Sequence, residues 1–389
     1  MSMKTLQSMD VGGKRVIVRA DLNVSFREDG AISDDFRLKA FLPTLRTLQS
    51  RDAITLVFSH LGRPDGKRVE RFALKPVAEK LSELLGKDIL FIDETVGKKA
   101  SAAAQNAKPG DIIVFENLRF NPGEESNDSS FARELSELGE LYVDDAFGVC
   151  HRAHASVVGL PKLLPSAAGM LLVREIATLT ALRDNPERPL TVILGGAKIS
   201  TKLPIVKHML PRTDALCLGG ALANTVLKAK GFHVGRSMIE ESMVEQMKEL
   251  VQDGKKLHLP KDVVVAQEAL ANAVVRTCLT GEVHEQEMML DIGPKTAEEF
   301  MEIAQKSRTV FWNGPLGWTE IPAFAKGTEY VARRLGDIEG FTVVGGGDIV
   351  AALANMRLLD KFKFISTGGG AMLEFLAGKE LPGVAALTQ

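Results

Sequence analysis

"VVGGGDIVAAL", residues 343–353, joins an apolar strand to a helix through three glycines. A turn of this kind presents free backbone N–H groups and the positive end of a helix, which together favour a bound phosphate. A carboxylate, Asp348, stands where the helix begins, and it would repel that phosphate. We therefore expect Asp348 to bind Mg²⁺, directly or through water, so that the metal bridges the carboxylate and the phosphate oxygens. The alternative role for Asp348 is a helix N-cap.

Apolar runs of strand length alternate with helical patterns along the whole chain. The expected strands are 14–19, 53–59, 111–116 and 140–145 in the first half, and 190–196, 215–220, 308–314, 341–347 and 363–370 in the second half. Residues 73–86 show the helical spacing, with an apolar stripe from Leu74 to Leu85 and Gly86 as the stop. Near-continuous Val, Ile and Leu runs between helices are typical of parallel sheets that are covered on both faces. The fold class is therefore α/β and doubly wound, with one sheet in each half.

The length of 389 residues predicts two lobes, because a single core stops growing at roughly 250–300 residues. An amphipathic helix followed by a Pro-rich break, "LLVREIATLTALRDNPERP" (171–189), separates the two sets of strands. We expect an N-terminal lobe over 1–170, a hinge helix and linker over 171–189, and a C-terminal lobe over 190–377.

Composition excludes several classes of partner. The formal net charge of -2 argues against nucleic acid or an anionic membrane as a partner bound through bulk charge. No apolar run approaches the roughly 18 residues of a membrane span. The three cysteines, Cys150, Cys217 and Cys278, are far apart and lack metal spacing, and the first residues lack the apolar stretch of a signal peptide. We expect a cytoplasmic protein with reduced thiols.

Basic and polar side chains follow the strands of the first half, at the edge where a doubly wound sheet binds its ligands. They are Asp21 and Asn23, His60 and Arg63, Arg119, and His151 and Arg152, with Arg37 able to join them. Guanidinium groups match phosphate and carboxylate oxygens bidentately, so this edge predicts a small substrate with several negative charges. For His154 a structural role is the favoured interpretation.

Glycine and lysine follow the strands of the second half. The turns are Gly195-Gly196-Ala197-Lys198 with Lys202, Gly219-Gly220, Asn313-Gly314-Pro315, Gly345-Gly346-Gly347-Asp348 and Gly368-Gly369-Gly370. Glycines let the backbone approach a ligand closely and helix N-termini supply N–H donors, so this edge predicts a nucleotide. Neither the P-loop pattern nor a convincing G-x-G-x-x-G is present, which disfavours a P-loop NTPase and a Rossmann dehydrogenase.

Eight motifs give the chain a resemblance to the phosphoglycerate kinase family along essentially its whole length. They are "RVIVRADLNV" (15–24), "SHLGRP" (59–64), "ENLRF" (116–120), "DDAFGVCHRAHAS" (144–156), "LGGAKISTK" (194–202), "WNGPLGWTE" (312–320), "GGGDI" (345–349) and "STGGGA" (366–371). The resemblance implies two lobes that face each other across a cleft, with 3-phosphoglycerate on the N-terminal lobe and Mg-ATP or Mg-ADP on the C-terminal lobe. The lobes would close to exchange a phosphoryl group, giving ADP and 1,3-bisphosphoglycerate in glycolysis or gluconeogenesis. It also implies a monomer and a tail, 378–389, that returns to the N-terminal lobe.

The resemblance assigns a role to each matching position. Substrate-binding positions are Asp21, Asn23, Arg37, His60, Leu61, Gly62, Arg63, Arg119 and Arg152. Nucleotide-binding positions are Gly196, Ala197, Lys198, Lys202, Gly220, Asn313, Glu320, Gly346, Gly347, Asp348 and Ile349, with Glu320 as the ribose contact and Asp348 as the metal ligand. Catalytic positions are Arg37, Lys198, Lys202, Gly368, Gly369 and Gly370.

The chain departs from the family pattern at a few uncharged positions. The usual "GGGDT" ends in Ile349, the "GGG" near the adenine ends in Ala221, "NVP" ends in Ser25, and "GVFE" reads Gly317-Trp318-Thr319-Glu320. Loss of one hydroxyl contact at Ile349 should cost about 0.5–1.5 kcal/mol. These changes leave every charged site residue in place.

The expected nucleophile is the 1-carboxylate of 3-phosphoglycerate, which is already ionised at neutral pH, so the reaction requires no general base. Two alternatives stay open at this point. The first is an NAD-dependent dehydrogenase on a two-domain α/β scaffold, and the second is a non-catalytic binding protein that retains ligands without turnover.

Overall fold

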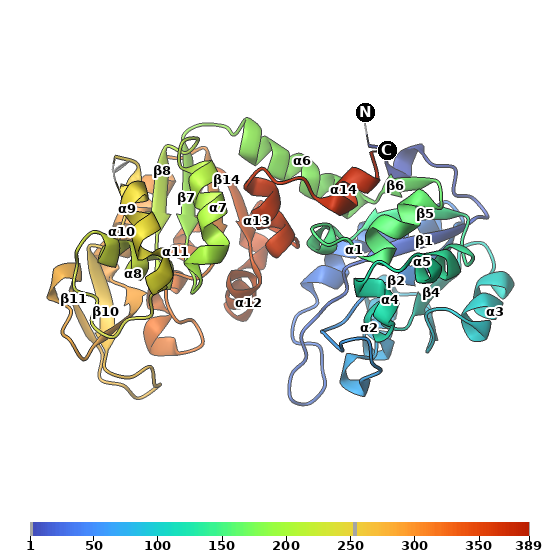
Figure 1. The fold of residues 1–389 in the computed structure, drawn as a ribbon, viewed down its shortest axis with the longest axis horizontal. Coiled ribbons are helices and arrows are strands. Elements are labelled where there is room, and N and C mark those ends of the chain that lie inside the picture. Colours follow the sequence, from blue (N-terminus) through green and yellow to red (C-terminus); the bar gives the residue numbers. More distant parts are fainter. Residues whose placement is uncertain (1–2, 252–254, 389) are drawn as a thin grey trace. The chain divides into compact units, whose positions relative to one another are not determined.

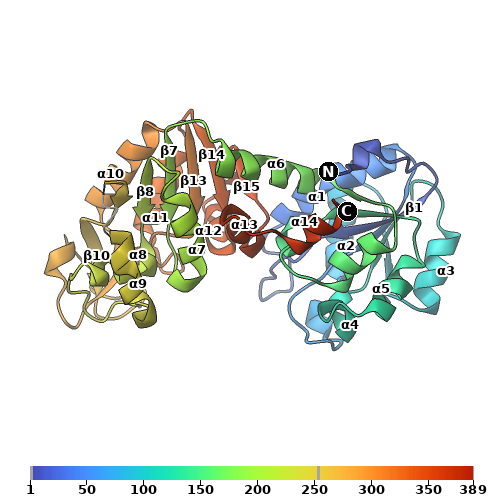
Figure 2. The same ribbon diagram turned by 45° about the horizontal axis from the view of Figure 1, so that its top comes forward.

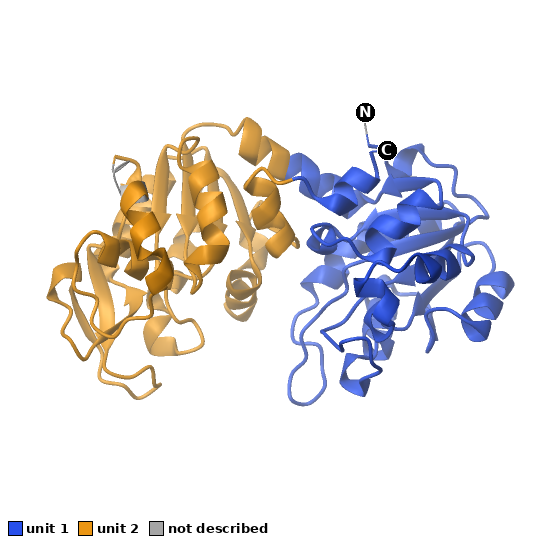
Figure 3. Ribbon diagram, in the orientation of Figure 1, with its two compact units in different colours: residues 1–178, 380–389 blue, residues 179–379 orange. Residues whose placement is uncertain are grey.

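The computed structural model describes residues 3–251 and 255–388. They form two compact units, coloured separately in Figure 3. Unit 1 comprises Met1–Thr178 and Glu380–Gln389, and unit 2 comprises Leu179–Lys379. The first boundary falls inside helix α6 (Met170–Asp184), so a single helix belongs to both units.

Unit 1 is built on a six-stranded sheet with the order β3-β4-β2-β1-β5-β6. Every pairing within it is parallel. The strands are β1 (Arg15–Ala20), β2 (Ile54–Phe58), β3 (Leu90–Ile92), β4 (Ile112–Phe115), β5 (Leu141–Asp145) and β6 (Ser166–Ala168). The helices include α1 (Phe36–Ser50), α2 (Lys75–Leu85), α3 (Lys98–Asn106), α4 (Pro122–Glu125) and α5 (Ser129–Ser136), which cover both faces of the sheet (Figures 1 and 2). The strand order reverses beside β1, which makes the carboxyl end of β1 the expected ligand position.

Unit 2 has a second six-stranded parallel sheet, with the order β15-β14-β13-β7-β8-β9. Its strands are β7 (Leu190–Leu194), β8 (Ala215–Leu218), β9 (Leu257–His258), β13 (Thr309–Asn313), β14 (Phe341–Gly345) and β15 (Phe364–Ser366). The helices around it include α7 (Ile199–Met209), α8 (Gly220–Ala229), α9 (Val244–Val251), α10 (Pro294–Gln305), α11 (Lys326–Leu335), α12 (Gly347–Asn355) and α13 (Gly370–Leu376). Its order reverses at β7 and β13, the two strands followed by the Gly195 and Asn313 turns.

The predicted α/β class with parallel, doubly wound sheets is confirmed, but the expectation of one sheet in each half is wrong for unit 2. A second, antiparallel sheet in this unit pairs β10 (Asp262–Ala266) with β11 (Arg276–Leu279) and β12 (Met288–Ile292). The short strands β3, β6 and β9 were also missed. Strands of two or three residues at a sheet edge carry too few side chains to show a period.

Burial of the apolar residues explains why these elements form. The central strands are almost entirely buried, and in unit 1 the apolar stripe of α2, including Val77 and Leu81, packs into the same core as Val16 and Val18. As predicted, α2 ends at Gly86, whose φ of 72° is a left-handed conformation that glycine adopts without strain. Among the helices of the described ranges, none is long and apolar enough to cross a membrane.

A buried carboxylate anchors helix α6 in unit 1. Asp145, the last residue of β5, accepts hydrogen bonds at Oδ1 from the N–H groups of Leu171 (2.8 Å) and Leu172 (3.1 Å). Gly169 lies so close to this carboxylate that a Cβ there would overlap it. The first turn of the helix that spans both units is therefore held by the end of a central strand.

The end of the chain lies in unit 1. Helix α14 (Pro382–Ala386) packs on residues 155–159, and Ala386 joins a small apolar cluster with Val149 and Val157. The Gly383 N–H donates to the carbonyl oxygen of Cys150 at 2.9 Å. The final segment therefore supports the backbone that leads into His151 and Arg152.

The pH dependence of stability should change in an Asp145→Asn variant. Burial raises the pKa of Asp145 to about 7, well above its ordinary value of 3.8. Between about pH 4 and 7 the folded chain therefore holds a proton that the unfolded chain releases, and this contribution to stability falls as the pH rises. Asparagine does not ionise and keeps an oxygen for the two N–H groups, so the melting temperature of the variant should improve relative to wild type from pH 5 to pH 8.

Calorimetry at both pH values would measure this change, with Asp145→Ala as the comparison. The Asp145→Ala variant should show the same trend with pH but a lower melting temperature throughout, because loss of the hydrogen-bond acceptor costs about 1–3 kcal/mol. A difference between Asp145→Asn and wild type that stays constant across this range would contradict the prediction.

Candidate active site

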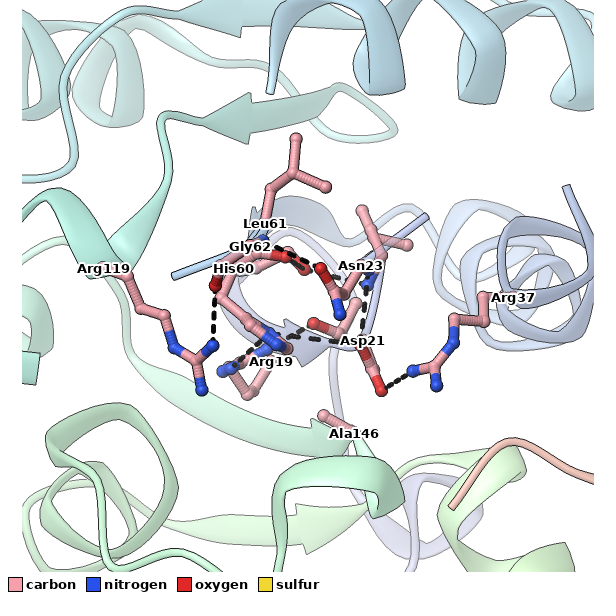
Figure 4. Close-up of polar contacts among 12 residues, drawn as sticks. Arg19, Asp21, Asn23, Arg37, His60, Leu61, Gly62, Arg119 and Ala146 are labelled. Atoms are coloured by element: carbon pink, nitrogen blue, oxygen red, sulfur yellow. Dashed lines mark hydrogen bonds and ion pairs between the residues drawn. The ribbon is translucent and has the colours of Figure 1, made fainter. Parts of the chain in front are cut away.

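Asp21 lies at the carboxyl end of β1, where the strand order of unit 1 reverses. Its side chain is buried, and Oδ2 forms an ion pair with Nη1 of Arg37 from the first turn of α1. Its Oδ1 accepts a hydrogen bond from the Asn23 N–H at 3.3 Å. Figure 4 shows these contacts beside His60. The carboxylate thus fixes a partly exposed guanidinium at the sheet edge.

The segment after β2 is held from both sides. Asn23 Oδ1 accepts from the Gly62 N–H at 2.8 Å, and Arg119 Nη1 donates to the Gly62 carbonyl oxygen at 2.8 Å (Figure 4). Leu61, the residue before Gly62, is buried. Three predicted substrate positions from three separate segments therefore form one hydrogen-bonded group.

His60 is as deeply buried as Arg119, and each of these residues has 4% of its surface exposed. Its Nδ1 lies 3.2 Å from Nη2 of Arg19 and 4.0 Å from Oδ1 of Asp21. Burial lowers the pKa of His60 well below its ordinary value, and the positive charges of Arg19 and Arg119 lower it further. The imidazole is neutral at physiological pH.

The arginines keep this edge of unit 1 positive. Burial lowers the pKa of Arg119 to about 10, although Glu125, 3.0 Å from its Nε, opposes that shift. Arg119 therefore remains charged at neutral pH. Arg152 is half-buried and close enough to affect the pKa of Arg119, whereas Arg63 is exposed. The structure thus brings most of the predicted substrate-binding side chains of unit 1 together, and Arg63 lies on their solvent side.

Sequence reasoning missed a buried layer beneath these residues. It contains Arg19 from β1, Glu124 from α4 and Ser156, all with 0% exposure. An arginine inside the apolar run "VIVRA" was a signal that could have revealed it, because a buried guanidinium needs partners. His154 belongs to the same layer: it is buried, its Nδ1 lies 3.7 Å from Oε1 of Glu124, and burial lowers its pKa to about 3.

In unit 2, the turns after β7 and β13 converge on the ammonium group of Lys202. This lysine lies on the first turns of α7 and is buried, and its Nζ donates to the Gly195 carbonyl oxygen and lies 3.5 Å from that of Asn313. Gly196 has φ +96° and Gly314 has φ +83°, and a Cβ at either position would press on Nζ. Glycine is therefore required here by backbone conformation and by the volume of the lysine.

The charge of Lys202 is set by burial and by one carboxylate. Burial lowers the pKa of Lys202 to about 8, and Asp348 acts in the opposite direction. Asn313 links the neighbouring turn, since its Nδ2 donates to the Gly345 carbonyl oxygen at 2.5 Å. The turns after β7, β13 and β14 thus form one surface around a partly desolvated cation.

Asp348 is exposed in the first turn of α12, and the N-cap of that helix is Gly346. The N-cap alternative for Asp348 is therefore wrong. Ile349 is fully buried in the apolar cluster of unit 2, with Trp312 and Leu353. Since its side chain lies in the core, the backbone N–H is the group that Ile349 can offer to a ligand.

The residues around Asp348 fit a metal ion that binds together with the phosphate groups of a ligand. Within residues 3–251 and 255–388, no three His, Cys, Asp or Glu side chains come together as a metal-binding group. Mg²⁺ is commonly held by one or two carboxylates together with substrate phosphates and water. A single exposed carboxylate beside a helix N-terminus that can accept phosphate satisfies that requirement.

Several of the remaining predicted positions lie at the starts of helices in unit 2. Gly220 begins α8 with φ +61°, and Gly369 is the N-cap of α13 with φ +50°. The Gly368 N–H donates to Ser366 Oγ at 3.1 Å, and Gly370 is the first residue of α13. Three further positions, Ala197, Lys198 and Glu320, are exposed, and Gly347 is the first residue of α12.

Comparison with known proteins agrees with this arrangement. The family model described as phosphoglycerate kinase matches residues 6–379. The chain belongs to the phosphoglycerate kinase family. The phosphoglycerate kinases of Moorella thermoacetica and Roseiflexus sp. are 48% and 47% identical to it, over 100% of this chain and 100% and 99% of theirs.

Solved structures give the same result. Phosphoglycerate kinase from Coxiella burnetii matches with a TM-score of 0.86 and 36% identity, covering 100% of this chain and 99% of that one. The enzyme from Pyrococcus horikoshii matches with a TM-score of 0.89 and 32% identity, covering 99% and 98%. Membership of the phosphoglycerate kinase family sets aside both the dehydrogenase and the non-catalytic binding protein.

Proposed function

We infer that the two units divide the substrates of the phosphoglycerate kinase reaction between them. Family membership makes the chain an ATP-dependent phosphotransferase that acts on 3-phosphoglycerate in glycolysis. The proposal is that unit 1 binds 3-phosphoglycerate and that unit 2 binds ATP or ADP. The observation that carries it is the contrast between the two sheet edges, one formed by arginines and the other by glycine turns around a buried lysine.

The arginine edge suits a small anion with charge at both ends. Arg37 and Arg119 keep their positions without a ligand, because Asp21 and the Gly62 carbonyl oxygen hold them. Donors that are fixed in advance lose little conformational entropy when a carboxylate or phosphate binds. Arg63 and Arg152 add positive charge toward solvent, so this edge is proposed to bind 3-phosphoglycerate and 1,3-bisphosphoglycerate.

The glycine edge suits a polyphosphate. Helices α12 and α13 begin at this edge with glycines, and the positive ends of these helices favour phosphate oxygens. The first N–H group of α8, that of Gly220, instead donates to the Leu316 carbonyl oxygen at 2.9 Å. Asp348 is proposed to hold Mg²⁺, which when bound neutralises charge on the phosphates. Lys198 and Lys202 would then contact the phosphates, and Glu320 is proposed to contact the ribose.

Catalysis is proposed to consist of positioning and charge stabilisation. The 1-carboxylate of 3-phosphoglycerate attacks the terminal phosphorus of ATP, the bond to the bridging oxygen breaks, and ADP leaves with that oxygen's charge. No proton moves in this step. Arg37, Lys198, Lys202 and the N–H groups of Gly369 and Gly370 are the proposed donors to the transferring group. The Gly368 N–H would have to leave Ser366 Oγ to join them.

The two units must approach each other for this step, because in-line transfer requires donor and acceptor oxygens within a few ångströms. We propose that closure bends the chain where it passes between units, in α6 and near residues 379 and 380. The proposed state is a cytoplasmic monomer. The three cysteines support the compartment, because all are buried free thiols.

The experiment that tests the function is a coupled assay of the purified chain with ATP, Mg²⁺ and 3-phosphoglycerate. Formation of the acyl phosphate is followed through its enzymatic reduction with NADH. We expect turnover that depends on both substrates. ATP consumption that is independent of 3-phosphoglycerate would overturn the proposal.

Replacing Lys202 with alanine should lower kcat far more than it raises KM for 3-phosphoglycerate. The charge of this lysine is proposed to act on the moving phosphoryl group, and removal of one such donor costs roughly 100- to 1,000-fold in rate. Steady-state kinetics of Lys202→Ala would measure both constants. Lys207→Ala, an exposed lysine on the same helix, is the matched control and should behave as wild type. A kcat within about twofold of wild type would refute the assignment of Lys202.

An Asp348→Asn variant should require more Mg²⁺ for half-maximal activity. Loss of the carboxylate charge weakens the metal complex of the nucleotide, so we expect a rise of about tenfold or more in the Mg²⁺ concentration at half-maximal rate. Binding of metal-free ATP, measured by calorimetry in the presence of a chelator, should become tighter, because a repulsive charge has been removed. Asp360→Asn, at an exposed site in the same unit, serves as the control. An unchanged requirement for Mg²⁺ would exclude Asp348 as the ligand.

A further inference from the structure

Arg19 directs each of its three nitrogen atoms to a different acceptor. Nε donates to Ser156 Oγ at 2.9 Å, Nη1 donates to the Ala20 carbonyl oxygen, and Nη2 lies 3.2 Å from His60 Nδ1. The side chain is fully buried, so water does not compete for these donors. The position of the guanidinium is therefore determined on three sides.

Ser156 and Glu124 complete the support on the side away from His60. Ser156 Oγ donates to Glu124 Oε1 at 2.6 Å, and the Ser156 N–H donates to Oε2 at 3.0 Å. Because the hydroxyl gives its one proton to Glu124, its lone pairs are free to accept from Arg19. Both carboxylate oxygens act as acceptors, which is the arrangement of an ionised glutamate. Burial raises the pKa of Glu124, and the charge of Arg19 and the bonds from Ser156 oppose that rise. Glu124 is fully buried and supplies a negative charge beneath Arg19.

The contact between Arg19 and His60 fixes the tautomer of the imidazole. A guanidinium has N–H donors and no acceptor, so His60 Nδ1 must accept. The ring proton then lies on Nε2. We propose that Arg19 is a positioning residue that holds His60 as a neutral imidazole with its proton on Nε2, and that Ser156 and Glu124 hold Arg19 in place for this purpose.

The charges around His60 favour this state. Arg19 from β1, Arg119 after β4 and Arg37 from α1 are positive, while Asp21 after β1 places a carboxylate oxygen 4.0 Å from Nδ1. His154, from the same buried layer, adds to the positive side when protonated. Protonation of Nδ1 would oppose the guanidinium directly and would draw Asp21 away from Arg37.

The consequence concerns substrate recognition, and it rests on the proposed function of unit 1. A neutral Nε2–H is a donor to an anionic oxygen at every pH where the enzyme works. An imidazole near its ordinary pKa would instead change charge between pH 5 and 8. Binding of 3-phosphoglycerate through His60 should therefore not vary with the ionisation of that residue.

Nitrogen NMR of the full-length chain labelled in histidine tests the proposal directly. A His60→Gln sample identifies the signals of His60 among those of the seven histidines. We expect a non-protonated Nδ1 and a protonated Nε2, both unchanged from pH 5.5 to 8. A proton on Nδ1, or a titration with a midpoint near the ordinary value of about 6.5, would overturn the proposal.

Variants separate positioning from a purely structural role. The double variant Arg19→Met, Glu124→Gln removes the guanidinium without leaving an unpaired buried carboxylate. We expect His60 to titrate in this variant, and KM for 3-phosphoglycerate to rise about tenfold and to become dependent on pH, while KM for ATP stays the same. Arg15→Met, the same change at the start of β1, is the control and should leave the His60 signals unchanged.

Ser156→Ala is the milder variant if the double variant does not fold, and it should allow a mixture of His60 tautomers. The proposal would be refuted if a folded variant that lacks Arg19 or Ser156 kept the wild-type His60 tautomer and the wild-type pH profile. Addition of 3-phosphoglycerate to the wild type should move the Nε2 signal. If the Nε2 signal did not move while His60 had the expected tautomer, the result would contradict the substrate assignment of unit 1. It would not contradict the role of Arg19.

Discussion

Positive charge held out of water is the constraint on which both sheet edges depend. Moving an ammonium or guanidinium group out of water costs several kcal/mol, even after the protein relaxes around it. In unit 1, Ser156 and Glu124 beneath Arg19 offset this cost. In unit 2, the Gly195 and Asn313 carbonyl oxygens do so for Lys202, with Asp348 as the nearby charge. The proposed anionic ligands would add further negative charge at both edges.

The two edges solve this problem with different backbone conformations. Arginine has a long side chain that ends in a planar guanidinium group. The arginines of unit 1 therefore reach across the sheet edge, and side chains such as Asp21 hold them by hydrogen bonds. The ammonium of Lys202 is compact, and the backbone must come to it. Positive φ angles at Gly196 and Gly314 permit this approach, and the absence of Cβ atoms leaves room for the lysine. The glycines at positions 196 and 314 are therefore explained by the lysine before any nucleotide is considered.

Much of the fold and of both sites could be predicted, because parallel strands carry strong local signals. The apolar runs gave the central strands. The residues at their ends lie together within each unit, Asp21 with His60 in unit 1 and Asn313 with Lys202 in unit 2, because carboxyl ends of parallel strands share an edge. The antiparallel sheet of unit 2 was missed, since a run such as that of β10 does not reveal the direction of its partner. Ser156 was missed because it contacts Arg19 across 137 positions in the chain, and no local pattern records such a contact. Glu124 was missed with it, because it joins this layer through its hydrogen bond with Ser156. The burial of Ile349 depends on how α12 is rotated on its sheet, which the glycine turn alone does not determine.

The return of the chain to unit 1 has a consequence for its synthesis. Unit 2 is one continuous stretch, so every contact inside it is available once residue 379 has been made. Unit 1 is interrupted, and its helix α14 is synthesised only after all of unit 2. The backbone around Cys150, which precedes His151 and Arg152, therefore gains its Gly383 partner only after all of unit 2 has been synthesised. Unit 2 can thus fold before unit 1 has acquired this supporting contact.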